Sequence, residues 1–234
     1  MEKLLKKILV VLTNESQYGY HPEATGLWLG EATEFVQVMT EAGFDIDYVS
    51  PKGGYVPIDP RSFKYASATD MKWYHDRDFQ DRALANSLSP EGLDPMEYSA
   101  IYFTGGHGVM WDFPYNEDLH KISWQIYQND GYLTSVCHGI SGLLFLKDDL
   151  GQYLIKRKHI TGFTNAEENL SGKKKYVPFL NEDVASLHGA EFSKKRPYAE
   201  YALTDGKFIT GQNPFSATAV ARLLVKELKN PLED

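Results

Sequence analysis

The sequence predicts an α/β protein with a doubly wound, mainly parallel β-sheet and helices on both faces. Three observations carry this prediction. Apolar β-rich runs alternate with helix-period segments from end to end, two of these runs end in glycine-rich turns, and the hydrophobic content of 42% suffices for a sizeable core. Because the 234 residues contain no repeat or clear linker, we expect one domain over residues 1–234.

The first segments of the chain alternate as a parallel sheet requires. Residues 6–13 are an apolar run after a charged start, which is typical of a central parallel strand. Residues 25–43 carry apolar side chains at helical spacing, and Gly43 closes this helix. Residues 45–51 are the second predicted strand, which Pro51 stops.

A long segment then interrupts the alternation before the third strand. Residues 52–69 are rich in Gly, Pro and Ser and are expected to form a loop. Residues 70–86 are expected to form a helix, and residues 100–108 are the third strand running into glycines. The sequence therefore predicts a lid or insertion at about residues 52–95.

The alternation resumes in the second half of the chain. Residues 116–130 are expected to form a helix, with Asn116 as its N-cap and acidic residues in its first turn. Residues 132–139 are a strand that passes at once into a helix over residues 140–147. Residues 158–164 are a further strand.

The last elements are a hairpin and a helix. Residues 199–211 are expected to form the hairpin, with Asp205 and Gly206 as its turn. Asn213 is expected to cap the final helix, with Pro214 at its first position. In doubly wound sheets, functional sites lie beyond the carboxyl ends of the strands. We therefore expect the functional site at the two glycine-rich strand ends.

Charge and cysteine content limit the classes of function. The formal net charge of −8 does not favour nucleic-acid binding, and the basic run over 173–175 is interpreted as a solvated loop. The single cysteine excludes an intrachain disulfide and favours a reducing, cytoplasmic location. The apolar run from Ile8 to Leu12 is too short for a signal peptide, and no stretch is long enough to span a membrane.

The segment Ser135-Val136-Cys137-His138-Gly139 is the strongest candidate for chemistry. A buried strand ends there and a helix begins, as in a nucleophile elbow, where a reactive side chain stands on a strained turn. The helix N-terminus is expected to lower the pKa of Cys137 and so favour a thiolate. The alternative interpretation is a buried, inert cysteine.

The segment Thr104-Gly105-Gly106-His107-Gly108 ends the neighbouring strand. Glycines there can turn backbone N–H groups toward a developing oxyanion, although an ordinary strand-to-loop turn is equally compatible with the pattern. Its spacing is not that of a dinucleotide fingerprint. The histidines are scattered, with no HExxH or CxxC, so we expect neither a metal nor a cofactor.

Several motifs together resemble the ThiJ/PfpI superfamily. They are TGLWLGEATEFVQVMTEAGFDIDYVSPKGG, YFTGGHGVMWDFP and SVCHG, and the second is similar to the branch of heat-shock chaperones and glutathione-independent glyoxalase III enzymes. ITGFTNAEE and TGQNPFSA are also similar to this branch. The resemblance covers nearly the whole chain and implies a flavodoxin-like fold and a homodimer.

The resemblance also implies roles for particular residues. It places the nucleophile at Cys137, a partner histidine at His138, and a protonated acid beside the sulfur at Glu31. The third acid of the triad falls on Glu168, with Glu167 as the near alternative.

Further implied positions concern the substrate pocket. The resemblance implies backbone oxyanion donors at Gly106 and His138 and places His107 in the pocket mouth. We therefore expect Gly105, Gly106 and His107 to face the substrate and its oxyanion. From the residues alone, a carboxyl pressed against a thiolate is expected to stay protonated, whereas a dipole-compensating role suits Glu31 equally well.

We therefore predict a cysteine-dependent, glutathione-independent glyoxalase III-like enzyme that converts methylglyoxal or related 2-oxoaldehydes to 2-hydroxy acids. We expect this enzyme to bind neither nucleic acid nor a membrane. One alternative is a cysteine peptidase or amidase using the same residues. Another is a holdase chaperone or an oxidation sensor, because an exposed low-pKa thiolate is what peroxide attacks first.

Overall fold

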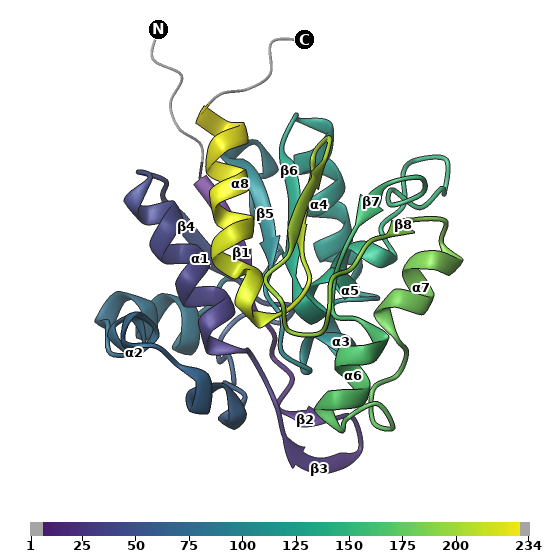
Figure 1. The fold of residues 1–234 in the computed structure, drawn as a ribbon. Helices are drawn as coiled ribbons and strands as arrows, with labels where there is room; N and C mark the ends of the chain where they lie inside the picture. Colours follow the sequence, from purple (N-terminus) through teal and green to yellow (C-terminus); the bar gives the residue numbers. More distant parts are fainter. Residues whose placement is uncertain (1–6, 230–234) are drawn as a thin grey trace, which may run out of the picture.

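A six-stranded sheet in the order β4-β1-β5-β6-β10-β9 forms the centre of the computed structural model, which describes residues 7–229 (Figure 1). Its strands are β1 (Lys7–Val11), β4 (Ile46–Val49), β5 (Tyr98–Phe103), β6 (Tyr132–Val136), β9 (Ala202–Asp205) and β10 (Phe208–Gly211). Neighbouring strands are parallel except β9 and β10, which form an antiparallel hairpin. The predicted doubly wound, mainly parallel α/β fold is confirmed.

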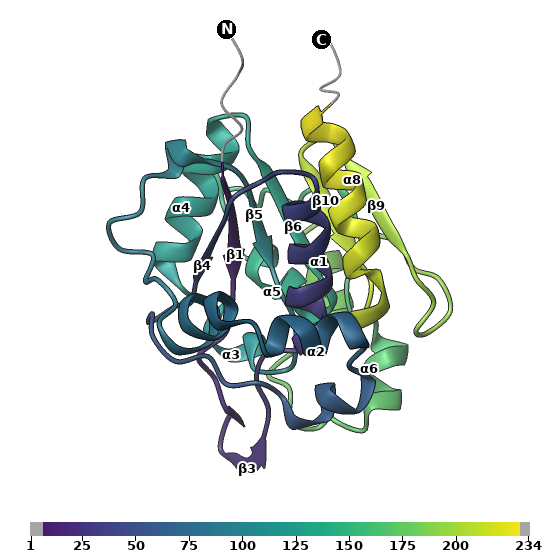
Figure 2. The same cartoon turned by 90° about the vertical axis from the view of Figure 1, so that its left-hand side faces the viewer.

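Helices cover both faces of this sheet, as Figure 2 shows for α1 and α8 on one side and α4 on the other. The α-helices of the described residues are α1 (Leu29–Glu41), α2 (Ala68–Tyr74), α3 (Val109–Asp112), α4 (Glu117–Gln128), α5 (Ser141–Leu144), α6 (Asn165–Ser171), α7 (Asn181–Leu187) and α8 (Ala217–Lys229). Strand β1 shows why both faces need cover. Ile8 and Val10 pack in the core cluster of α1 and α8, while Leu9 and Val11 pack in the cluster of α4 and α5.

The predicted strands that run into glycines end earlier than expected. β5 stops at Phe103 rather than at 108, and β6 stops at Val136 rather than at 139. In both strands, the hydrogen bonds to the neighbouring strands end where the turn begins. β1 is described from Lys7, and Lys6 of the predicted run lies outside the described residues.

The segment between β4 and β5 differs from its prediction in two places. The expected loop contains the 3₁₀ helix η1 (Pro60–Tyr65), and the helix expected over residues 70–86 is wrong as a single element. It is divided into α2 and a π-helix, η2 (Phe79–Ala85), because Asp76 Oδ1 accepts a hydrogen bond from the Phe79 N–H group at 2.9 Å and starts a new turn. A 3₁₀ turn, η3 (Pro95–Glu97), leads into β5.

Several short elements were not predicted. A hairpin of β2 (Gln17–Tyr18) and β3 (His21–Ala24) lies near the carboxyl ends of the strands, as do α3 and α6 (Figure 1). The strand expected over residues 158–164 is reduced to β7 (His159–Ile160), which pairs with β8 (Glu191–Phe192) outside the main sheet. Asn213 caps the 3₁₀ turn η5 (Pro214–Ser216), through the Phe215 N–H group, rather than α8 itself.

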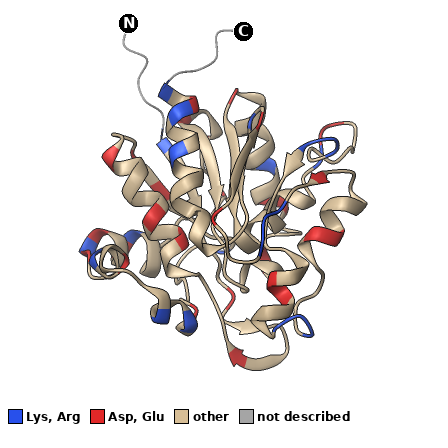
Figure 3. Cartoon of the chain, viewed as in Figure 1, with Lys and Arg blue, Asp and Glu red and all other residues tan. Residues whose placement is uncertain are grey.

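Two observations concern partners of the chain. In the described part, none of the helices combines the length and apolar character that a membrane crossing requires. In Figure 3, Lys and Arg lie among Asp and Glu over several outer helices, while two loops carry short basic runs.

Candidate active site

Cys137 stands on a strained turn between β6 and the 3₁₀ helix η4 (Cys137–Ile140), which continues into α5. Its φ of 56° is in the left-handed region, which few residues with a side chain adopt. Gly139 holds the turn against β5, since a Cβ there would lie 2.2 Å from the Phe103 carbonyl oxygen. This is the geometry of a nucleophile elbow at the carboxyl edge of the sheet.

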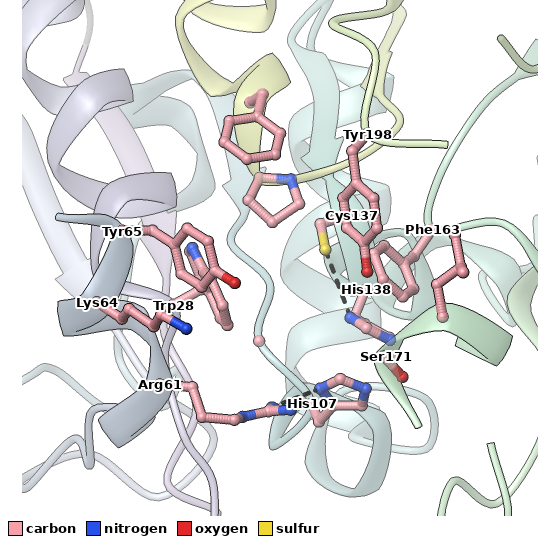
Figure 4. Close-up of a pocket in the computed structure, with 14 residues that line it drawn as sticks. Trp28, Arg61, Lys64, Tyr65, His107, Cys137, His138, Phe163, Ser171 and Tyr198 are labelled. Atoms are coloured by element: carbon pink, nitrogen blue, oxygen red, sulfur yellow. Dashed lines mark hydrogen bonds between the residues drawn. The ribbon is translucent and has the colours of Figure 1, made fainter. Parts of the chain in front are cut away.

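The turn opens into a pocket of about 640 Å³ (Figure 4). Cys137 and His138 line it from the elbow, and Gly106 and His107 line it from the end of β5. Arg61, Lys64 and Tyr65 enter it from η1, which lies in the segment predicted to be a loop. The pocket therefore lies where a doubly wound sheet places its ligands.

The Cys137 sulfur, His138 and Glu168 form a connected set. The His138 Nδ1 atom lies 3.4 Å from Cys137 Sγ, and its Nε2 atom lies 2.7 Å from Glu168 Oε2. Because a carboxylate only accepts, the Nε2 atom carries the proton and Nδ1 presents its lone pair to the thiol. The positive φ of Cys137 lets sequence neighbours face one pocket, which a regular strand would forbid.

Glu168, rather than Glu167, contacts the histidine. Both belong to α6, where Thr164 and Glu167 form a capping box. Glu167 is fully buried and its Oε1 atom accepts hydrogen bonds from the Tyr198 N–H group at 2.8 Å and from Asn213 at 3.0 Å. It thus fixes Tyr198, a pocket residue with a positive φ of 59° that sequence reasoning missed.

Burial and the two histidine partners of Glu168 shift the pKa of its carboxyl in opposite directions. Burial alone would raise the pKa of this carboxyl, but the electrostatic interaction with His138 and the hydrogen bonds from His107 and His138 hold the pKa below its ordinary range. Glu168 is therefore an anion at neutral pH. It is suited to orient His138 and to stabilise its protonated form.

A second chain of contacts reaches Glu168 from η1. The buried Asp59 carboxylate binds Arg61, with 2.7 Å between Oδ2 and Nη2. The Arg61 Nη2 atom donates to His107 Nδ1 at 3.0 Å, and His107 Nε2 lies 3.0 Å from Glu168 Oε1. His107 is only 4% exposed, and burial together with the neighbouring His138 lowers the pKa of His107 to about 4. It is therefore a neutral donor inside the pocket wall rather than a residue of an open mouth.

The same residues bear on whether a metal could be held here. His107, His138 and Glu168 bring three ligand atoms within 4.8 Å of one another, a cluster hidden in the sequence. In both histidines, however, Nε2 carries the proton that Glu168 accepts, because Nδ1 of His107 accepts from Arg61 and Nδ1 of His138 faces the thiol. A metal at Nε2 would need the opposite tautomer. The donor set fits hydrogen bonding better than metal binding.

Glu31 lies on the other side of Cys137, in the first turn of α1. It is fully buried, and its Oε2 atom accepts a hydrogen bond from the Gly105 N–H group at 2.6 Å. Its Oε1 atom has no hydrogen-bond partner among the described residues. Burial raises the pKa of Glu31 well above its ordinary value, so the carboxyl is protonated at neutral pH.

The surroundings of the Cys137 thiol differ from the expected exposed, low-pKa environment. Cys137 is only 2% exposed, and burial, followed by the adjacent Glu31 carboxyl, raises its pKa well above the ordinary value. The expected low-pKa, exposed thiolate is therefore wrong, because desolvation outweighs the short helix behind the elbow. The sensor alternative loses the exposed anion on which it depended. A base is needed to take the thiol proton, and His138 Nδ1 is in place.

The glycines of the TGGHG segment have separate functions. The N–H group of Gly105 donates to Glu31, so the expectation that Gly105 faces the substrate is not met. Gly106 does line the pocket, with a φ of 100°, and a Cβ there would lie 2.1 Å from the Gly26 carbonyl oxygen. Only glycine fits this close approach of two backbones.

The fold and the pocket define a class of protein: a doubly wound α/β protein with a cysteine elbow, an adjacent histidine and two buried carboxyl groups. The family model described as DJ-1/PfpI family matches residues 24–227. The chain belongs to the DJ-1/PfpI family.

Individual relatives give a finer comparison. The chain is 34% identical over 237 residues to the glutathione-independent glyoxalase HSP31 of Saccharomyces cerevisiae, covering 96% of this chain and 99% of that protein. The crystal structure of glyoxalase III from Candida albicans is similar with a TM-score of 0.83 and 31% identity, over 94% of this chain and 96% of that one. The Rapid Encystment Protein of 24 kDa from Francisella tularensis is similar with a TM-score of 0.92 and 38% identity, over 96% and 99%.

Proposed function

We propose that this protein is a glutathione-independent glyoxalase that converts methylglyoxal or related 2-oxoaldehydes to 2-hydroxy acids. The observation that carries the proposal is the pocket-lining Cys137 sulfur, 3.4 Å from a histidine nitrogen held by Glu168, with a neutral carboxyl behind it. Relatives that match nearly the whole chain bear the name of this activity. The carboxyl, histidine and thiol supply an acid, a base and a nucleophile.

The first step forms a bond between sulfur and the aldehyde carbon. His138 Nδ1 takes the thiol proton as Cys137 Sγ attacks, and this proton then passes to the aldehyde oxygen, which gives a neutral hemithioacetal. Backbone N–H groups of Gly106 and His138 stabilise the negative charge that develops on that oxygen. No external thiol is required, because the protein supplies the sulfur.

The second step moves hydrogen from the first carbon to the second. His138 removes the proton from the carbon bonded to sulfur, while Glu31 donates its proton to the neighbouring ketone oxygen, giving an enediol. His138 then protonates the second carbon, and Glu31 recovers a proton from the first oxygen. Both groups regain their starting states, and the product is a thioester of the 2-hydroxy acid.

The last step releases the acid. Water attacks the thioester carbonyl, His138 takes one of its protons and returns it to the departing sulfur, and the 2-hydroxy acid leaves. For methylglyoxal the product is lactate. Water supplies both the oxygen and the hydrogen that the product gains, so neither an oxidant nor a reductant takes part.

The test is lactate formation from methylglyoxal in buffer free of glutathione and other thiols. The wild-type protein is expected to form lactate, and the isosteric Cys137→Ser variant is expected to be slower by at least about 10³-fold, as when other covalent nucleophiles are removed. Thermal unfolding of both proteins controls for folding. A fully active serine variant, or a folded wild type that makes no lactate, would contradict the proposal.

We further propose that the protein works as a homodimer in the cytoplasm and that residues 52–95 form the lid of its single domain. The family relationship supports the first part, and the pocket contacts of η1 support the second. Light scattering after size-exclusion chromatography measures the first, and a monomer would contradict it.

A further inference from the structure

The pocket is much larger than the three-carbon aldehyde that the proposed function places in it. Its volume of about 640 Å³ falls in the range of pockets that hold drug-sized ligands, whereas methylglyoxal is only a few water molecules in size. The Cys137 sulfur occupies one side of this space (Figure 4). The remainder is available to a substituent on the far end of a longer 2-oxoaldehyde.

The charge of the pocket is opposite to that of the chain. The chain has a formal net charge of −8. Yet the described residues that line the pocket include the two cations Arg61 and Lys64 and neither Asp nor Glu. Arg61 is balanced by the buried Asp59, so Lys64 contributes the uncompensated charge. The nearby Glu168 carboxylate is already engaged by two histidines, so the Lys64 ammonium is the charge left to attract an anionic group of a ligand in the pocket.

Lys64 lies across the pocket from the Cys137 sulfur and near aromatic rings, whereas Arg61 reaches His107. Figure 4 shows Lys64, Tyr65 and Trp28 on the side of the pocket that faces Cys137 and Tyr198. The Lys64 Nζ atom lies 5.9 Å from the centroid of the Tyr65 ring. A longer substrate that bonds to the sulfur would therefore extend its other end toward the side of the pocket that carries the Lys64 ammonium group.

We propose that the pocket selects 2-oxoaldehydes that carry an anionic end group, which Lys64 binds with support from Arg61. This proposal rests on the proposed function and names its substrate class. The reaction on such a substrate is unchanged: the aldehyde end becomes the 2-hydroxy carboxylate, with water as the added reactant. The anionic end group takes no part in bond making and serves only to hold the substrate.

The test compares 4,5-dioxopentanoate with its neutral methyl ester, two substrates that share the reacting end. The wild-type protein is expected to prefer the acid in kcat/KM. The ratio of acid to ester is expected to fall about fivefold in Lys64→Gln, the size of a partly exposed ion pair. It is also expected to fall as salt is raised in the wild type but not in the variant. Lys72→Gln on the exposed α2 is the matched control and should leave the ratio unchanged.

A binding measurement separates this proposal from the proposed function. The product expected from the acid is 2-hydroxyglutarate, and calorimetric titration compares its affinity with that of lactate in the wild type and in Lys64→Gln. Tighter binding of 2-hydroxyglutarate that is lost in the variant supports the anion site even if methylglyoxal is not turned over. The anion site would be overturned if the acid-to-ester ratio of kcat/KM were equal in the wild type and in Lys64→Gln and if both proteins bound 2-hydroxyglutarate and lactate equally well. The glyoxalase proposal would still stand.

Discussion

The two sides of Cys137 each hold a buried carboxyl group, but the two groups are in opposite states of charge. The Glu31 carboxyl accepts one short hydrogen bond from the Gly105 N–H group, and the Cys137 thiol is its only other hydrogen-bonding neighbour among the described residues. By contrast, Glu168 accepts from His107, His138 and Ser171. Burial raises the pKa of Glu31, whereas the histidines hold the pKa of Glu168 below its ordinary range.

This comparison shows that donors rather than burial decide which carboxyl is ionised. Both side chains are nearly inaccessible to water, so desolvation disfavours the charge in each. Only Glu168 receives enough donated hydrogen bonds to offset that cost. The Cys137 thiol thus lies near one protonated carboxyl and one carboxylate that contacts His138, two states that suit the proton donor and the orienting anion of the proposed mechanism.

Removing the anion is expected to have the largest effect. Glu168→Gln places an amide opposite two N–H donors, so His138 loses its fixed tautomer and kcat is expected to fall about 10³-fold. The same change leaves buried groups unpaired and is expected to lower the free energy of unfolding at pH 7 by about 3 kcal/mol. Steady-state kinetics and urea unfolding measure both. A stable variant with wild-type kcat would show that Glu168 does not orient the base.

Removing the neutral acid is expected to lower activity yet raise stability. Glu31→Gln keeps the oxygen that accepts from Gly105 but cannot exchange protons, so kcat is expected to fall about 10²-fold. Because the folded pKa of Glu31 lies above its unfolded value, wild-type stability is lost as pH rises above the unfolded pKa. The variant lacks this loss.

The stability difference between Glu31→Gln and wild type is therefore expected to grow by about 1.4 kcal/mol per pH unit. Urea unfolding at pH 5, 6 and 7 measures it, and Glu41→Gln, at the exposed end of α1, is the matched control for the substitution. A flat difference across this range would mean that the Glu31 carboxyl is ionised in the folded protein.

The smallest effect is expected from the residue that supports Glu168. His107→Leu removes the donor to Glu168 Oε1 but leaves that of Ser171, so kcat is expected to fall about tenfold. His107→Gln can still donate and is expected to recover most of the loss. Kinetics across a pH range test this, since a purely structural role would lower both variants equally.

The sequence could predict the sheet because its signals are local. Apolar strands such as β1, glycine at the elbow and the Asp205-Gly206 turn each act on their own neighbourhood. Helix α6 was missed even though Thr164 and Glu167 have the spacing of a capping box, a signal that was available. The break between α2 and η2 depends on one side-chain contact of Asp76, which periodicity does not reveal.

The site was predicted less completely than the fold. Residues adjacent to recognisable turns, such as Cys137 and His138, could be identified, as could Glu168 through the family resemblance. Arg61 could not, because its function depends on contacts with Asp59 and with His107, a residue far along the chain. The charge of the thiol was also predicted wrongly, since burial is a property of the folded molecule rather than of a motif.

The one cysteine of the chain has a practical consequence for any future measurement. Since the only sulfhydryl group lines the pocket, an alkylating reagent that reacts with a thiol of the folded protein reacts at Cys137. The rate of this labelling therefore reports access to the pocket without a substrate. Molecules that occupy the cavity can be ranked by how strongly they slow the labelling.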